Sequence, residues 1–419
     1  MTDAPPFAPA IKQFFDKALP VDRGIHTLVL GEAHHKTEHV DFLSQHIDQL
    51  QQDHRVDTLG IEMQSYVNVV LWAYQDGTLE QQLGPNLSRL YLGHIFAAVS
   101  KEEFRDHASS SATLAMLAMD RDIQPVAYDS RQTFAEHFKQ SYELFRGADS
   151  EEAFHARQQN IRTSAERLNQ ISTSEDRHSW ALHEVDWLMR LHPEYKERLA
   201  AIDHAIEVGH QKIRQGKLSG DGLSACLFDA LAGPGNRLVI AGARHMGGAG
   251  HPPTTKKPQN HPAHIDGTLS YHLSALCQSG DMVTNAWMGT TKFLDDLRND
   301  VKDDLANPRR KMIFGTPLSA VNIETNTVTD FSPLPPTEEM AQSVHAVGFH
   351  GLAGYMDASA NEAKVVTLAD KFMPLYKGTP SEKAEHTKRH VNPLLMPDIK
   401  RAMDAVHSAA CQLDRRFER

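Results

Sequence analysis

Cysteine is scarce in this chain, which has three such residues, Cys226, Cys277 and Cys411, among 419. The three are far apart in the sequence and odd in number. This excludes a disulfide framework and a paired-cysteine metal site. So sparse a use of cysteine fits a reducing compartment.

Long apolar runs are also missing. The longest ones, such as 95–99, are far too short to span a bilayer. The first residues have neither the basic nor the apolar region of a signal peptide. We therefore expect no membrane span, and either a cytoplasmic location or secretion without a cleaved signal by a specialised secretion system.

An excess of positive charge is absent as well, since the net charge is −11. This argues against binding to nucleic acid or anionic lipid. The spacing of Gly242 and Gly247 matches the start of a phosphate-binding loop, but Gly248 and Ala249 stand where Lys and Ser or Thr are needed. We expect no bound nucleotide, and a small molecule or a peptide as the partner.

Two similar phrases stand out in what the chain does contain. TLVLGEAHH (27–35) and RLVIAGARH (237–245) share one plan, in which β-forming residues precede a glycine and then a histidine. A short apolar run that ends at a glycine is typical of a buried strand in a parallel sheet. In open α/β sheets, ligands bind at the carboxyl ends of the strands. The two phrases can therefore supply two parts of one site.

Further patterns extend this α/β plan. Residues 56–63 predict a second strand with Glu62 at its exit, and 125–128 predict a third that leads to Asp129 and Arg131. An amphipathic helix is expected to carry Val40, Leu43, Ile47 and Leu50. Residues 134–231 read as helical almost throughout, with Asp221 as the N-cap of the last helix.

These elements predict an α/β fold with a central, mostly parallel sheet of two related halves flanked by helices. We assign residues 1–20 to an N-terminal arm and 21–330 to one α/β domain, with 134–231 as a helical insertion. Residues 331–419 form a C-terminal extension that ends in a helix.

One metal-binding pattern is present beside the first phrase. His35, Glu38 and His39 match the H-x-x-E-H signature of inverted zinc peptidases, in which two histidines four apart bind zinc and the glutamate polarises a water. The chain has 25 histidines, so the match arises easily by chance. It also lies at a predicted strand-to-helix turn, not within a helix.

A second set of residues forms a sharper constellation. Glu32, His34, Glu62 and His245 leave three predicted strands at the same end. Each alone is explained equally well as a polar residue that caps a strand or helix end. Together they should converge, and converging carboxylates and imidazoles shift each other's pKa values, which suits proton transfer near neutral pH.

The order of these motifs resembles the erythromycin-esterase/ChaN-like superfamily, which is related to the TIKI/TraB proteins and to domains of bacterial toxins and effectors. The similarity covers roughly residues 21–290 and rests on five short stretches, at 31–34, 60–62, 125–131, 157–161 and 241–245. It implies a site between two halves of the sheet. Glu32, His34, Glu62 and His245 would be its catalytic set. The residues that line the substrate would be His35, Asp129, Arg131, Arg157 and Arg244.

The leading hypothesis is a hydrolase. In it His34 and a carboxylate, Glu62 or Glu32, activate a water, and protonated His245 with Arg131 or Arg157 stabilises negative charge on the substrate. A divalent metal ion held by the same groups would serve equally. The rival hypotheses are a non-catalytic haem- or metal-binding protein and an effector or toxin that acts on a host molecule. His35, adjacent to His34, is an alternative for the key histidine.

Overall fold

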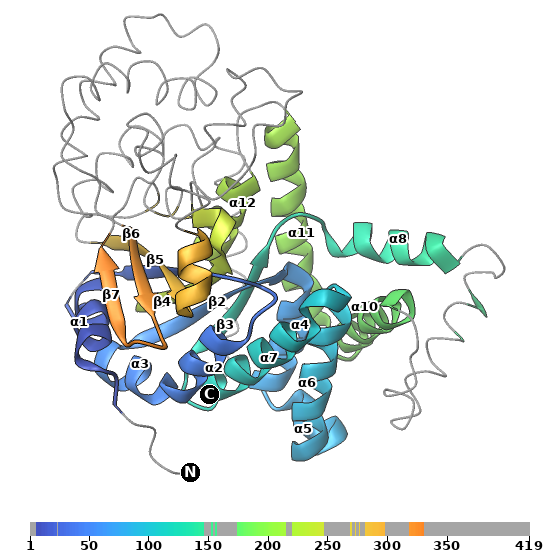
Figure 1. The fold of residues 1–419 in the computed structure, drawn as a ribbon. Coiled ribbons are helices and arrows are strands. Elements are labelled where there is room, and N and C mark those ends of the chain that lie inside the picture. The colour runs from blue at the N-terminus through green and yellow to red at the C-terminus, as the bar shows by residue number, and fades with distance from the viewer. Residues whose placement is uncertain are drawn as a thin grey trace, which may run out of the picture.

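A mixed, seven-stranded sheet forms the centre of the described part of the molecule (Figure 1). The computed structural model describes residues 6–22, 24–145, 174–214, 220–246, 281–297 and 318–330, together with a few single positions. The strands in chain order are β1 (His26–Glu32), β2 (Val56–Gln64), β3 (Gln124–Asp129), β4 (Asn236–Gly242), β5 (Met282–Gly289), β6 (Leu318–Asn322) and β7 (Thr327–Asp330).

The spatial order of the strands is β3-β2-β4-β1-β5-β6-β7. All neighbours are parallel except β6 and β7, which pair antiparallel. The predicted α/β fold with a mostly parallel sheet is therefore confirmed. Pro125 lies in β3, the strand at one edge of the sheet, where a missing backbone donor is tolerated.

The two similar phrases of the sequence lie side by side. β1 and β4 pair in register, so that Leu28 lies opposite Leu238 and Gly31 opposite Ala241. Every residue of both strands is buried, as expected for strands covered on both faces. The strands on either side of the long helical segment thus belong to one sheet.

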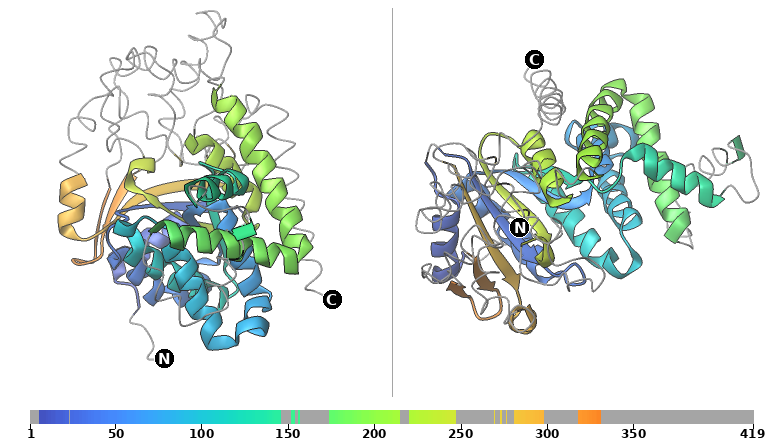
Figure 2. Two further views of the ribbon diagram at one scale, coloured as in Figure 1. Left: turned by 90° about the vertical axis from the view of Figure 1, so that its right-hand side faces the viewer. Right: turned by 90° about the horizontal axis from the view of Figure 1, so that it is seen from above.

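Helices cover both faces of this sheet (Figure 2). Those in the first part of the chain are α1 (Pro9–Ala18), α2 (Glu38–Gln45), α3 (Ile47–His54), α4 (Asn68–Gln75), α5 (Thr78–Leu83), α6 (Pro85–Val99) and α7 (Arg105–Met119). Between β3 and β4, every described element is a helix: α8 (Phe134–Phe145), α10 (Ser174–Leu191), α11 (Pro193–Arg214) and α12 (Gly220–Leu231). None of the helices in the described ranges combines the length and the apolarity that a membrane crossing requires.

The predicted amphipathic helix around Val40 and Leu50 is two helices, with α2 ending and α3 beginning around His46. The His46 ring explains the break, because its Nδ1 atom lies 2.8 Å from the carbonyl oxygen of Phe42 and the ring stacks on Phe7. The apolar face of the prediction is nevertheless correct, since Val40, Leu43, Ile47 and Leu50 are all buried.

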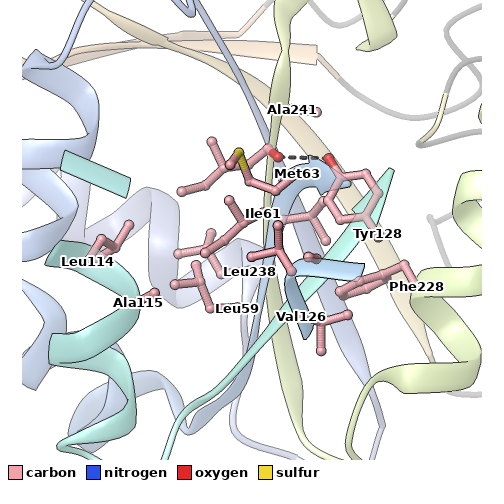
Figure 3. Close-up of a cluster of buried hydrophobic side chains, with 14 of the residues drawn as sticks. Leu59, Ile61, Met63, Leu114, Ala115, Val126, Tyr128, Phe228, Leu238 and Ala241 are labelled. Carbon is pink, nitrogen blue, oxygen red and sulfur yellow. Dashed lines mark hydrogen bonds between the residues drawn. The ribbon is translucent and has the colours of Figure 1, made fainter. Parts of the chain in front are cut away.

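The core lies on both sides of the sheet (Figure 3). Leu59, Ile61 and Leu238 face Leu114 and Ala115 of α7. On the opposite face, Val126 and Tyr128 lie near Phe228 of α12, and the ring of Phe228 packs edge to face on that of Tyr128. The Tyr128 hydroxyl donates a hydrogen bond to the carbonyl oxygen of Ile240 (2.7 Å), which ties β3 to β4 across β2. The predicted C-terminal extension, 331–419, and the helix expected at its end lie outside the described residues.

Candidate active site at the carboxyl ends of the strands

Three neighbouring strands deliver polar residues to one edge of the sheet. Glu32 is the last residue of β1, Glu62 lies near the end of β2, and β4 leads through Gly242 into the short helix η4 (Ala243–Met246), which carries His245. The three strands are adjacent and parallel, so their carboxyl ends meet. The four residues predicted as the catalytic set are thus brought together.

The site extends from α12 to α2 and α7. Glu32 contacts a histidine of α2 and a histidine of α7, and Glu62 contacts His245, which pairs with Asp221 of α12. The pairing of β2 with β3 shifts register after Ile61, so Glu62 lies at an irregular end of its strand.

Glu62 lies between two imidazoles. Its carboxylate oxygens are 3.4 Å from Nε2 of His34 and 3.2 Å from Nε2 of His245, and one oxygen accepts a hydrogen bond from the backbone N–H of Gly242 (2.8 Å). Burial opposes ionisation of this carboxyl, but the hydrogen bonds and positive charges of His245 and His34 outweigh it. The pKa of Glu62 is held well below its usual value.

Glu32 is the second hub of the site. Its Oε1 atom is 2.9 Å from Nδ1 of His34, its Oε2 atom is 2.7 Å from Nε2 of His107, and His39 lies against the same Oε2 atom. Burial again raises the pKa, while the hydrogen bonds from His107 and His34 lower it more strongly. The pKa of Glu32 is about 2, so this buried carboxylate is charged at neutral pH.

His34 joins the two hubs, because each of its ring nitrogens lies next to one carboxylate. Burial disfavours the charged ring, but Glu32 and Glu62 overcome this and raise its pKa to about 10. Its side chain keeps 29% of its surface exposed. His34 is therefore a charged imidazolium at the surface of the site.

His245 is held in the same manner on the other side. Nδ1 of its ring lies 2.8 Å from Oδ1 of Asp221, in the first turn of α12, and Nε2 faces Glu62. Burial is outweighed by the hydrogen bonds that the ring donates to Asp221 and Glu62, which raise the pKa of His245 to about 11. The residues thus form a continuous series, which we call the carboxylate–imidazole chain: Asp221, His245, Glu62, His34, Glu32 and His107.

Of the residues predicted to line the substrate, some lie near the carboxylate–imidazole chain and others lie outside the described residues. Asp129 is buried and binds the guanidinium of Arg131, whose side chain is 73% exposed. This hydrogen bond is the main reason that the pKa of Arg131 is raised, and Glu62 adds to it, which places Arg131 within electrostatic reach of the chain. Arg157 lies outside the described residues, as does the side chain of Arg244 in η4.

His35 and Glu38 do not join the chain. Both are exposed, and His35 precedes the start of α2 at Glu38, so the H-x-x-E-H pattern does not lie on one helix face. Its last histidine, His39, is buried and faces Glu32. His34 and His35 are the two candidates for the key histidine. Of these, it is His34 that contacts the carboxylates of the carboxylate–imidazole chain.

Two members of the chain were not identified from the sequence as site residues. His107 lies in the first turn of α7, in a stretch with no motif around it. Asp221 was predicted as an N-cap, but it lies inside the first turn of α12 and its carboxylate binds His245. Asp221 had a detectable signal, because an acidic residue at a helix start near the sheet edge is available to a histidine that leaves the next strand.

Comparisons of the chain with family models, with curated proteins and with solved structures found no match. The chemistry of the site is therefore what bears on its function. That chemistry is a set of fixed charges, with two imidazolium rings each between two carboxylates, at the edge where α/β proteins bind ligands.

Proposed function

We propose that the carboxylate–imidazole chain is the active site of a hydrolase that activates a water molecule at the carboxyl ends of β1, β2 and β4. The observation that carries the proposal is that Glu62 lies between His34 and His245, whose rings are partly exposed. A carboxylate next to two partly exposed, protonated imidazoles offers a proton acceptor and proton donors within one hydrogen-bond length.

The pKa values assign the roles. His34 and His245 are charged, so neither ring is the resting base. Glu62, one of the two carboxylates considered for this role, accepts the proton of the attacking water as its oxygen bonds to the carbonyl carbon. His245 donates a proton to the leaving oxygen as the bond to that carbon breaks. The proton on Glu62 then passes to His245 across their 3.2 Å contact, which restores both groups.

The remaining residues of the chain position these groups. His34 holds Glu62 from one side and Asp221 holds His245 from the other. Arg131, on the exposed side of Asp129, supplies positive charge toward an acidic group of the substrate. The resemblance to erythromycin-esterase/ChaN-like proteins supports a lactone, ester or peptide substrate. A host molecule, as for the toxin and effector relatives, is a second substrate class within the same proposal.

Hydrolysis of a macrolide lactone and of p-nitrophenyl esters by the purified full chain tests the proposal. We expect ring opening, seen by mass spectrometry as the gain of one water, or release of nitrophenol. Glu62→Gln and His245→Ala should each lower kcat/KM by about 100-fold or more, the usual contribution of general acid–base catalysis.

His192→Gln is the matched control, since His192 contacts Thr78 and Glu194, which do not belong to the carboxylate–imidazole chain. Folding of each variant is checked by circular dichroism. Hydrolysis that persists unchanged in folded Glu62→Gln and His245→Ala would contradict the proposal.

A further inference from the structure

Two buried side chains and one half-buried side chain converge at the face of the sheet that α2 and α7 cover. Glu32 ends β1, His39 lies in the first turn of α2, and His107 lies in the first turn of α7. One ligand atom from each, a carboxylate oxygen and two imidazole nitrogens, lies within 4.8 Å of the others. The side chains of Glu32 and His39 are 2% and 3% exposed, and that of His107 is 12% exposed.

The donor atoms of this group face one another. Nε2 of His107 and Nε2 of His39 both lie against Oε2 of Glu32. A metal ion is bound by unprotonated imidazole nitrogens and an ionised carboxylate, and it replaces the protons that such groups otherwise share. The three side chains therefore already present their donor atoms to one common position.

We propose that Glu32, His39 and His107 bind one divalent transition-metal ion with the preferences of Zn²⁺. Two imidazoles and one carboxylate are the donor set of three-ligand zinc sites, in which a fourth position stays open to water or substrate. Nitrogen donors favour such an ion over Mg²⁺ or Ca²⁺, which prefer oxygen ligands alone.

A second feature supports a metal ligand at Glu32. Its Oε1 atom pairs with Nδ1 of His34, so the carboxylate keeps Oε2 for the two other imidazoles. Metal-binding side chains are commonly oriented by such outer hydrogen bonds. The metal site can be tested apart from the proposed hydrolysis, because neither His39 nor His107 accepts or donates a proton in it.

Metal binding by the full chain is measured after treatment with a chelator and removal of that chelator. Zn²⁺ is then added, and bound metal is counted by elemental analysis, with Co²⁺ absorption in the visible range as a second readout. We expect one equivalent of metal and a higher Tm with Zn²⁺, because an ion that binds only the folded state stabilises it.

His107→Gln and His39→Gln should weaken Zn²⁺ affinity by at least about 100-fold, since loss of an outer-shell partner alone typically costs 10–100-fold. His35→Ala is the matched control, as an exposed histidine four positions before His39, and should keep the metal. His245→Ala should also keep the metal while losing hydrolysis, which separates this proposal from the proposed function.

Absence of Zn²⁺ and Co²⁺ binding in the folded wild type would overturn the proposal. So would undiminished binding in folded His107→Gln, whose partly exposed side chain makes this variant decisive if His39→Gln does not fold. Loss of metal in His35→Ala but not in His107→Gln would assign the ion to the H-x-x-E-H pattern instead. A haem absorption spectrum with no divalent metal bound would also contradict it.

Discussion

The ring of His34 lies directly over Gly242: a Cβ atom at Gly242 would be 2.7 Å from Nε2 of His34. The same glycine donates its backbone N–H to Glu62. The glycine that ends β4 therefore permits the close approach of a histidine in the turn after β1 and holds the carboxylate that this histidine contacts. This relationship links the two similar phrases of the sequence at the level of single atoms.

Gly242→Ala should displace the imidazole of His34 and lower hydrolytic kcat/KM by about 100-fold, because small displacements of positioning groups have effects of this size. The free energy of unfolding should change little by comparison, since the ring is partly exposed and can move outward. Steady-state kinetics and urea unfolding measure the two effects.

Gly93→Ala in α6 is the control for this variant, because a Cβ atom at Gly93 would meet no atom within 4 Å. Wild-type activity in Gly242→Ala would show that the position of His34 over this glycine does not matter for catalysis.

Asp221→Asn should shift the alkaline limb of the pH–activity profile to lower pH. Burial lowers the pKa of His245, and its hydrogen bond to Asp221 is the largest contribution that raises it to about 11. Removal of an adjacent negative charge typically changes a pKa by about 1–3 units. The general acid is then lost at a lower pH, which kcat/KM measured from neutral to alkaline pH will detect.

Asp229→Asn controls for a charge change in the same helix, since Asp229 pairs with Arg237 and not with His245. An unchanged alkaline limb in folded Asp221→Asn would contradict the assignment of His245 as the acid.

Stability of the protein in the presence of a chelator should fall on both sides of a window from about pH 4.5 to 6.5. The pKa of Glu62 is depressed below 4.5, so its contribution is present above pH 4.5 and is lost as the pH falls. The pKa of His245 is raised from 6.5 to about 11, so its contribution is complete below pH 6.5 and is lost as the pH rises toward 11.

Urea unfolding at a series of pH values measures this dependence. His245→Gln should make the alkaline fall of stability shallower and leave the part that His34, with a pKa raised to about 10, contributes, whereas His192→Gln should keep the wild-type curve. A stability that is constant from pH 6.5 to 10 in the wild type would argue against a charged His245 in the folded state.

Phe228→Ala should lower the free energy of unfolding by about 3–5 kcal/mol, the usual cost of deleting a buried phenylalanine ring. The ring is fully buried, packs on Tyr128, and fills the space above Gly60. Leu87→Ala, at an exposed position, should change stability by less than about 0.5 kcal/mol. Equal effects of the two variants in urea unfolding would show that the face under α12 is not part of the core.

The strands could be predicted from the sequence because a short apolar run that ends at a glycine or a charged residue is typical of a buried strand. β1, β2 and β4 follow the predicted runs closely, and the residues after each run lie at the predicted edge. The break at His46 could not be predicted, because it depends on a contact with Phe7, from a distant segment.

The rest of the candidate site was hidden for a similar reason. His107 has no periodic or motif context, and its place beside Glu32 comes from the packing of α7 next to α2. For Asp221 the residue and its helix were identified, but a carboxylate at a helix start can cap its own backbone or bind a neighbouring side chain. Only the position of His245 after β4 decides between these.

The place of β1 between β4 and β5 determines when the sheet around it can form during synthesis. Both of its neighbours come far later in the chain, since β4 begins at Asn236 and β5 at Met282. A ribosome that has released only the first half of the chain has made Glu32 and His34 without either strand that holds β1. The two parts of the site therefore come together late, and a nascent chain that stops before Asn236 contains Glu32 and His34 but neither β4 nor His245.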